Sequence, residues 1–449
     1  MNRRIFFKQL SKGAALAGLM NTTGKTFAAE NTLSSAIRSP LKMTKVKAIL
    51  TAPARVRLCV VKVETSEPGL YGVGCATFTQ RIRTVVTAVD EYLAPFLAGK
   101  DADNIEDIWQ SMYQSSYWRN GPVLMNALSG VDAALWDIKA KRAGVPLYQL
   151  LGGKCRTGVP VYRHASGKTQ EVVLESARRF MSEGTRYIRA QIGIEGQATY
   201  GAGLGAITNT APPKLVGEGH FAGELFEPRK YRLAVPKLFK YLREQLGDEI
   251  ELLHDMHERL PPIDAIGLAK ELEPYRLFFL EDPLAPEDVG YFKTLRQQCA
   301  TPIAMGELFN NPNEWLSLVS GRLIDFIRIH ISQVGGMTMA RKVAAMCEFF
   351  SVRTAWHGPG DVSPVGHAAN LHLDLACHNF GIQEVINFSE ALYEVFPGTP
   401  ELRAGYLWAN DKPGLGIDID EEKAAKYPIT VQPIEWTQSR WPDGTLWTP

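Results

Sequence analysis

The chain lacks an excess of charge of either sign. Its 449 residues include 49 Lys and Arg against 48 Asp and Glu, so the formal net charge is +1. No long run of Lys or Arg interrupts this balance. Nucleic acids and anionic membrane surfaces attract concentrated positive charge, so composition favours neither as a partner. The 45% hydrophobic and 22% charged residues are typical of a globular protein.

Closely spaced cysteines are also absent. The chain has six cysteines, and no two of them form a CxxC pair. This spacing argues against zinc-ribbon and thioredoxin-like chemistry. We interpret most of the cysteines as small buried hydrophobic residues.

The weakly apolar stretch near the N-terminus, Gly13 to Met20, is far shorter than the roughly 20 residues that a membrane span needs. It follows Arg3-Arg4, and the small residues around Ala28 offer a cleavage site. Residues 1–28 therefore resemble a twin-arginine export signal. We predict a periplasmic protein without a membrane span. A basic N-terminus without signal function would instead leave the protein in the cytoplasm.

Residues 43–154 show a mixed pattern that predicts an α+β domain. β-rich runs precede stretches of helical periodicity, in the order 57–64, 70–74, 85–97, 105–113 and 123–143. Gly and Pro then cluster between positions 144 and 153, where we place the domain boundary.

Residues 155–400 alternate between short β-like runs and helical stretches. Eight runs are candidate strands: 159–162, 187–191, 251–254, 277–280, 302–305, 326–329, 353–356 and 380–383. Eight such units predict a closed parallel barrel. The long Gly-rich interval between the second and third strands is either an active-site lid or a surface insertion. Residues 401–449 form a loop-rich tail that we expect to return to the first domain.

Three acids recur at one spacing. Asp255, Glu281 and Glu307 are 26 residues apart, and each follows a candidate strand. One barrel unit takes about 30 residues, so the three acids should end successive strands and point into one mouth. Neighbouring carboxylates repel one another, and a hard divalent cation relieves that repulsion. Oxygen-only ligation favours Mg²⁺ over Zn²⁺.

The remaining strand ends are polar as well. His330, His357 and Glu384 continue the spacing, and Asp361 follows His357. Arg189 and Gln191 end the second strand, and His164 follows the first. In barrel enzymes the chemistry lies at this rim.

Several segments carry a specific resemblance. They are YIRAQIG, LLHDMHERL, FFLEDP, MGELFN, WHGPGDVSP, NFGIQE and PGLGIDIDEEKAAKYP. From about Met43 to near the C-terminus the chain resembles the mannonate dehydratase group of the enolase superfamily, within the mandelate racemase/muconate lactonizing enzyme family. The resemblance implies an α/β fold, a modified (β/α)7β TIM-type barrel with an α+β N-terminal capping domain. It also implies Mg²⁺ and a homo-oligomer.

The resemblance further implies a role for each site residue. Asp255, Glu281 and Glu307 would hold Mg²⁺, which binds the carboxylate of a sugar acid. Tyr200 with Arg189 would remove the proton beside that carboxylate, and His257 would protonate the departing β-hydroxyl. The side chains left to bind the substrate are Gln191, His330, His357, Asp361 and Glu384.

Alternatives remain for these roles. Tyr200 could be a surface aromatic, Arg189 an ion-pair partner of a ligand acid, and His257 a support for Asp255. His357 could be structural, and His330 could be a second acid–base group or a bystander.

The favoured reaction is dehydration of D-mannonate or D-gluconate to 2-keto-3-deoxy-D-gluconate. A racemisation or another elimination, and a metal- or sugar-acid-binding protein with degenerate catalysis, stay open. Fold alone does not separate these functions.

Overall fold

The computed structural model describes residues 40–194, 224–430 and 439–447. The predicted export signal, Tyr200 and most of the Gly-rich interval lie outside these residues. Within the described part of the chain, no helix is both long and apolar enough to cross a membrane.

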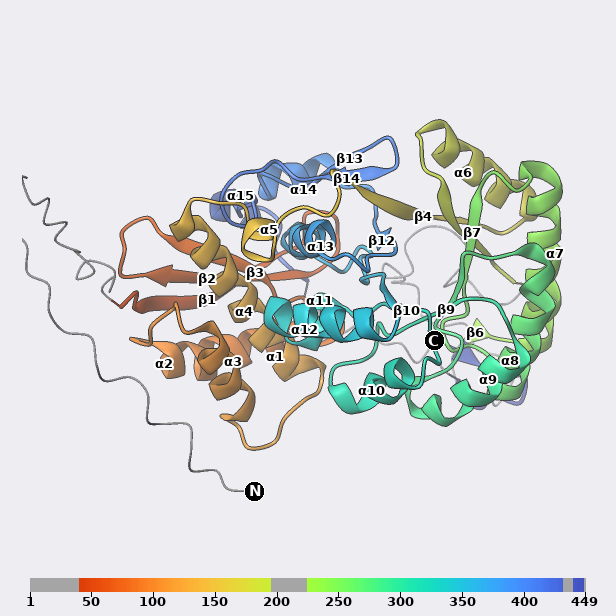
Figure 1. Ribbon diagram of the computed structural model, residues 1–449, viewed down its shortest axis with the longest axis horizontal. Coiled ribbons are helices and arrows are strands. Elements are labelled where there is room, and N and C mark those ends of the chain that lie inside the picture. The colour runs from red at the N-terminus through yellow and green to blue at the C-terminus, as the bar shows by residue number, and fades with distance from the viewer. Residues whose placement is uncertain (1–39, 195–223, 431–438, 448–449) are drawn as a thin grey trace, which may run out of the picture. The chain divides into compact units, whose positions relative to one another are not determined.

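An antiparallel sheet begins the described chain. Its three strands pair in sequence order: β1 (Met43–Thr51), β2 (Leu58–Thr65) and β3 (Tyr71–Cys75). The long helix α4 (Pro122–Ala143) packs along this sheet, with α3 (Ile105–Gln114) against α4 (Figure 1). A Cβ at Gly72 or Gly74 would stand 2.0 Å from a backbone oxygen of α4. Because only glycine permits this approach, these two positions set the distance between sheet and helix.

Eight parallel strands follow at the positions predicted from the sequence. They are β4 (Val159–Gly167), β5 (Tyr187–Ile192), β7 (Glu251–Asp255), β8 (Phe279–Glu281), β9 (Ile303–Met305), β10 (Phe326–Ile327), β11 (Arg353–Thr354) and β12 (Gln383–Glu384). From β4 to β11 each strand pairs with the next in this series. A bridge from Thr354 to Phe380 leads to β12, which pairs with β4. The sheet therefore closes on itself, and the predicted barrel is confirmed.

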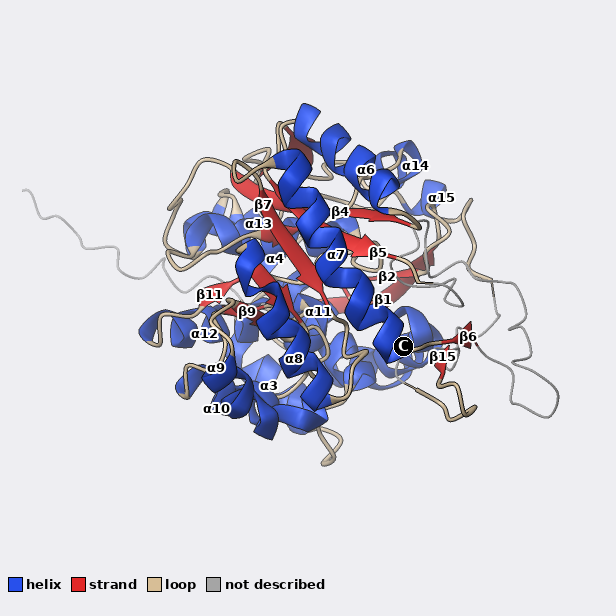
Figure 2. Ribbon diagram, turned by 90° about the vertical axis from the view of Figure 1, so that its right-hand side faces the viewer, coloured by secondary structure: helices blue, strands red, loops and turns tan. Residues whose placement is uncertain are grey.

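Helices connect the barrel strands. The described connections contain α6 (Gln170–Ser182), α7 (Pro228–Leu246), α8 (Pro262–Leu272), α9 (Phe292–Gln298), α10 (Pro312–Ser320), α11 (Ile331–Val334) with α12 (Gly336–Phe349), and α13 (Pro364–Ala376). Figure 2 shows α7 crossing over the strands with α8 beside it. Local signals start several of these helices: the side chains of Thr169 and Ser363 cap α6 and α13, and Asn311 with Glu314 forms a capping box on α10. Because helices fill every connection, the chain has the (β/α)7β order that was predicted.

The barrel interior begins with a layer of apolar side chains. One residue from each strand, or directly beside it in the case of β11 and β12, contributes: Tyr162, Tyr187, Leu253, Phe279, Ala304, Phe326, Ala355 and Ile382. Side chains alternate between the two faces of a strand, so the residues two positions farther on point the same way. The layer therefore forms an apolar floor below the side chains that lie two positions farther along each strand.

The N-terminal sheet and its helices contact the barrel through α4 and α3. The Trp109 indole donates to the Gly335 carbonyl at 2.8 Å, and the Trp136 indole donates to the Thr338 hydroxyl at 2.8 Å. The buried Asp132 carboxylate accepts the Thr338 backbone N–H at 2.8 Å. These contacts attach the sheet-bearing helix to the start of α12.

The C-terminal residues contact both parts of the chain. The hairpin β13 (Glu401–Arg403) and β14 (Tyr406–Trp408) pairs with the start of β4. Farther on, Glu421 of α15 (Glu421–Ala424) forms ion pairs with Lys47 and Lys62 of the N-terminal sheet. The Trp447 indole donates to the Arg259 carbonyl at 2.9 Å, so the end of the described chain lies against the loop after β7.

Candidate active site

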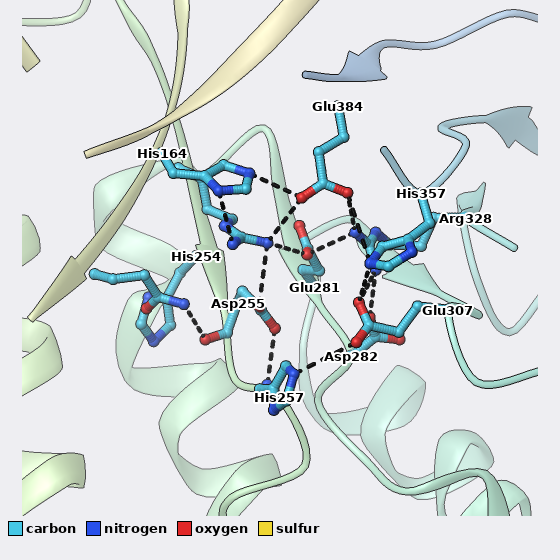
Figure 3. Close-up of polar contacts among 12 residues, drawn as sticks. His164, His254, Asp255, His257, Glu281, Asp282, Glu307, Arg328, His357 and Glu384 are labelled. Carbon is cyan, nitrogen blue, oxygen red and sulfur yellow. Dashed lines mark hydrogen bonds and ion pairs between the residues drawn. The ribbon is translucent and has the colours of Figure 1, made fainter. Parts of the chain in front are cut away.

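A polar layer lies directly above the apolar floor of the barrel. Two residues beyond the inward apolar residue, each strand or the residues that follow it carry a polar side chain. Arg189 is one of them. Figure 3 shows the others: His164, Asp255, Glu281, Arg328, His357 and Glu384. On β9 the corresponding residue is Gly306, and the adjacent Glu307 reaches the site instead. The strand period of two therefore gathers these side chains at the C-terminal ends of the barrel strands.

Arg189 connects three of the acids. Its Nη1 lies 2.6 Å from Glu281 Oε1, 3.1 Å from Asp255 Oδ2 and 3.4 Å from Glu384 Oε1. All four residues are buried, and buried charges need partners of opposite sign. Arg189 is thus an ion-pair partner of the site acids, which is one of the roles that the sequence left open.

Arg328 is the second cation of the site, and no part of it is exposed. Its Nη1 lies 2.5 Å from Glu307 Oε2 and 2.7 Å from Asp282 Oδ2. Its Nη2 lies 2.9 Å from Glu281 Oε1 and 2.8 Å from Glu384 Oε2. One guanidinium group therefore stands between Glu281 and Glu307, two of the three acids predicted to share a metal.

Carboxylate oxygens nevertheless converge at one point. One oxygen each of Asp255, Glu281 and Asp282 lies within 4.8 Å of the others, and all three residues are buried. This donor set suits a hard divalent cation. Asp282 joins the cluster in place of the predicted Glu307, whose carboxylate contacts Arg328, His257 and His357.

Burial and pairing shift the pKa values of these acids in opposite directions. Burial raises the pKa of Glu281 to about 7 despite Arg189 and Arg328, and raises that of Asp282 well above its usual value. Burial would also raise the pKa of Glu307, but His357 and Arg328 outweigh it and hold that pKa well below its usual value. Burial would likewise raise the pKa of Glu384, but Arg328 and His164 outweigh it and hold that pKa well below its usual value. The raised pKa values show that the arginines do not fully offset the cost of charging Glu281 and Asp282, so an added cation beside these two acids would stabilise their ionised forms.

His257 lies across from Glu307, with its Nε2 3.4 Å from Glu307 Oε1, and its backbone N–H donates to Asp255 Oδ1 at 2.8 Å. Its φ of 51° is left-handed, as is that of Glu258. Burial lowers the pKa of His257, but Glu307 and Asp255 outweigh it and raise the pKa to about 9. His257 is therefore protonated at neutral pH.

His330, which follows β10, and His357 and Asp361, which follow β11, form a second group. One nitrogen or oxygen of each lies within 4.8 Å of the others. His357 Nε2 lies 3.3 Å from Glu307 Oε2, so this group adjoins the acids. Burial lowers the pKa of His330 well below its usual value, whereas Glu307 overcomes burial and raises that of His357.

Gln191 and His164 support the strand ends. The Gln191 amide donates to the Asp255 carbonyl at 2.8 Å. His164 Nδ1 lies 3.2 Å from Arg189 Nη2, and its Nε2 lies 2.8 Å from Glu384 Oε1. Because a guanidinium can only donate, His164 accepts at Nδ1, and the proton of the neutral ring is on Nε2, the atom that faces Glu384.

Two family models match the chain. The mandelate racemase/muconate lactonizing enzyme N-terminal domain matches residues 32–152, and the enolase C-terminal domain-like model matches residues 230–423. The chain belongs to the mandelate racemase/muconate lactonizing enzyme family of the enolase superfamily. The family expected from the sequence motifs is therefore confirmed.

Among members of this family, the D-galactonate dehydratase family member RspA of Pantoea ananatis is 57% identical over 92% of this chain and 100% of that protein. An enolase of Pantoea ananatis, solved with bound D-gluconate and Mg, is 56% identical with a TM-score of 0.87, covering 91% of this chain and 100% of that one. A member of the enolase superfamily from Salmonella Typhimurium is 24% identical with a TM-score of 0.74, covering 86% of this chain and 98% of that one, and shows the shared fold alone.

Sequence reasoning missed two site residues of this family member, Arg328 and Asp282. A signal for Arg328 was present, because it follows the inward Phe326 by two positions and must point into the barrel. Asp282 is adjacent to Glu281 and would point outward in a regular strand. Its φ of 36° departs from strand geometry, and its Oδ2 reaches Arg328.

Proposed function

We propose that this chain is a Mg²⁺-dependent acid-sugar dehydratase that converts D-gluconate or D-mannonate to 2-keto-3-deoxy-D-gluconate. The observation that carries the proposal is the convergence of Asp255, Glu281 and Asp282 oxygens at the barrel mouth. It occurs in a chain 56% identical to an enolase whose structure holds D-gluconate and Mg.

The metal ligands we propose are Asp255, Glu281 and Glu307, with Asp282 beside them. Glu307 Oε2 now lies on Arg328, whereas its Oε1 faces His257. Glu307 would therefore have to exchange part of its contact with Arg328 for the cation. When bound, Mg²⁺ would supply positive charge for the substrate carboxylate and for the negative charge that develops beside it.

Tyr200 is the base that we propose for the proton beside the carboxylate. Arg189 lies in β5, eleven residues before Tyr200 in the sequence, and its guanidinium contacts buried acids. A fixed cation close to a phenol favours the phenolate, which is the form that accepts a proton.

His257 is the acid that we propose for the β-hydroxyl. With its pKa raised to about 9 it carries a proton at neutral pH. The C–H bond at C2 and the C–O bond at C3 break, the proton from His257 leaves with the hydroxyl as water, and the resulting enol becomes the 2-keto acid. Glu384 and His357 line the same mouth, with Gln191 holding the end of β7, and we propose that they orient the other substrate hydroxyls.

A panel of sugar acids with purified protein, with and without Mg²⁺, tests the function through formation of 2-keto acid. The Tyr200→Phe variant should lose turnover yet bind Mg²⁺ as the wild type does. Tyr92→Phe is the matched control, because Tyr92 is 70% exposed on the N-terminal part of the chain. Full turnover by Tyr200→Phe would remove Tyr200 from the mechanism, and absence of any 2-keto acid from the whole panel would overturn the function.

Export and assembly also stay proposals. We propose periplasmic export directed by Arg3-Arg4 and a homo-oligomer in solution. Cell fractionation of wild type against a variant with both arginines replaced by lysine tests the first. Light scattering of the purified protein tests the second.

A further inference from the structure

We propose that His330 is a neutral hydrogen-bond donor that recognises a hydroxyl group of the substrate, and that it serves neither as a base nor as a metal ligand. The inference deepens the proposed function, on which it rests, by assigning a specificity residue in the same site. It also chooses between the roles that the sequence left open for His330.

The first observation concerns the Nδ1 atom of His330. The backbone N–H of Ser332 donates to Nδ1 at 3.2 Å, and the Ser332 hydroxyl lies 2.9 Å from the same atom. The Cys75 thiol lies 3.5 Å from the Thr77 hydroxyl and 3.7 Å from the Ser332 hydroxyl, and its one proton can serve only one of them, so the backbone N–H of Ser332 is the contact that decides. A backbone N–H cannot accept, so Nδ1 must carry a lone pair. The single proton of the neutral ring is therefore on Nε2.

The second observation concerns the Nε2 atom. His330 is completely buried, and its Nε2 has no hydrogen-bond partner among the described residues. His357 Nδ1 and Asp361 Oδ1 are likewise buried and without partners there. Buried polar groups are almost always paired, so these three neighbouring atoms are suited to hydrogen-bond a polar group of a ligand.

The hydrogen-bonding chemistry of His330 and Asp361 selects the kind of ligand. A metal would need the Nε2 lone pair, which would move the proton to Nδ1 against the Ser332 N–H. A catalytic base needs the same lone pair. A hydroxyl group instead accepts from His330 Nε2–H and donates to the Asp361 carboxylate, so it satisfies both. A second carboxylate would meet Asp361 with like charge.

Two substitutions at this position separate the contacts of the ring. His330→Asn keeps an acceptor near Nδ1 for the Ser332 N–H but places no group near Nε2. His330→Gln places an amide donor near Nε2. In calorimetric titrations with D-gluconate and Mg²⁺, we expect Asn to weaken binding about 10-fold and Gln to recover most of the loss. Melting curves and Mg²⁺ binding check that both variants fold and retain the neighbouring cation site.

Deoxy analogues of the sugar acid identify the partner. Wild type should lose about 10-fold in affinity for the analogue that lacks the contacted hydroxyl, whereas His330→Asn should bind this analogue and the parent acid alike. The same loss for both proteins across all analogues would overturn the proposal. A second equivalent of bound divalent metal that disappears in His330→Asn would overturn it as well.

The protonation state can be tested without any substrate. In ¹⁵N-histidine-labelled protein, the His330 signals are those that vanish in His330→Asn, and their shifts should report a neutral ring protonated at Nε2. A charged ring, or a proton on Nδ1, would overturn the inference even if the enzyme dehydrates sugar acids. If no sugar acid binds or reacts but this tautomer is found, the proposed function fails and the donor assignment stands.

Discussion

Replacing Arg328 with Met tests whether this guanidinium holds the acids of the barrel mouth together. Arg328 is fully buried and lies within 2.9 Å of Glu281, Asp282, Glu307 and Glu384. Methionine keeps much of the apolar length of the side chain and removes the charge. The variant would leave three buried carboxylates and the partly exposed Glu307 without this cation, while Arg189 would still contact Glu281 and Glu384.

The expected loss of stability follows from the burial of these charges. Removing one partner of a buried ion pair costs about 3–5 kcal/mol, because the other charge stays buried without compensation. Protonation of the acids limits that cost. Glu281 has a pKa already raised to about 7 by burial, and that of Asp282 is higher than usual, so these acids gain protons easily. We therefore expect a loss of about 4 kcal/mol at about pH 8 and a smaller loss at about pH 6.

Urea denaturation of both proteins at the two pH values, followed by circular dichroism, measures the effect. Arg276→Met is the matched control, because the ion pair of Arg276 with Asp248 is 65% and 67% exposed. Such surface pairs contribute about 1 kcal/mol or less. The reasoning fails if Arg328→Met loses no more than the control at about pH 8, or if its loss is larger at about pH 6.

Three further predictions concern other parts of the chain. Burial raises the pKa of Asp132 to about 7, so the folded state binds this proton more tightly than the unfolded state, and the stability that it contributes is lost as pH rises from about 4 through about 7. Asp132→Asn should therefore gain stability relative to wild type on going from about pH 5 to about pH 8 in urea titrations, and an unchanged difference would contradict the assignment. Gly74→Ala would place a Cβ 2.0 Å from the Gly130 carbonyl oxygen and should destabilise the protein by about 2 kcal/mol, seen as a lower melting temperature; an unchanged melting temperature would refute the close approach. Asp255→Asn should abolish Mg²⁺ binding in calorimetric titrations while the chain remains folded, and wild-type affinity in that variant would exclude Asp255 as a ligand.

The fold could be predicted from the sequence because its signals are local. Each barrel strand is an apolar run of a few residues, and its length and neighbours identify it without knowledge of the rest. The 26-residue spacing of Asp255, Glu281 and Glu307 depends only on the repeat of strand and helix. Strand ends were less accurate: the strand predicted to end at residue 329 ends at Ile327, where the residues that carry the site begin.

The partners of each site residue could not be predicted in the same way. Arg328 and Glu307 are 21 residues apart in sequence, and their contact depends on the pairing of β9 with β10. A left-handed backbone conformation places the Asp282 side chain in the site, and the sequence did not predict that conformation. The tautomer of His330 depends on one backbone N–H two residues away.

By itself, the sequence determined the barrel, the order of its polar strand ends and the family, because strand period and repeat length are properties of short segments. The tertiary structure decided that two buried arginines pair with these acids, with Glu281 and Glu384 contacting both, and that Asp282 joins Asp255 and Glu281. Charge pairing acts over a few ångströms in space and is independent of separation along the chain, so it appears only once the barrel has closed.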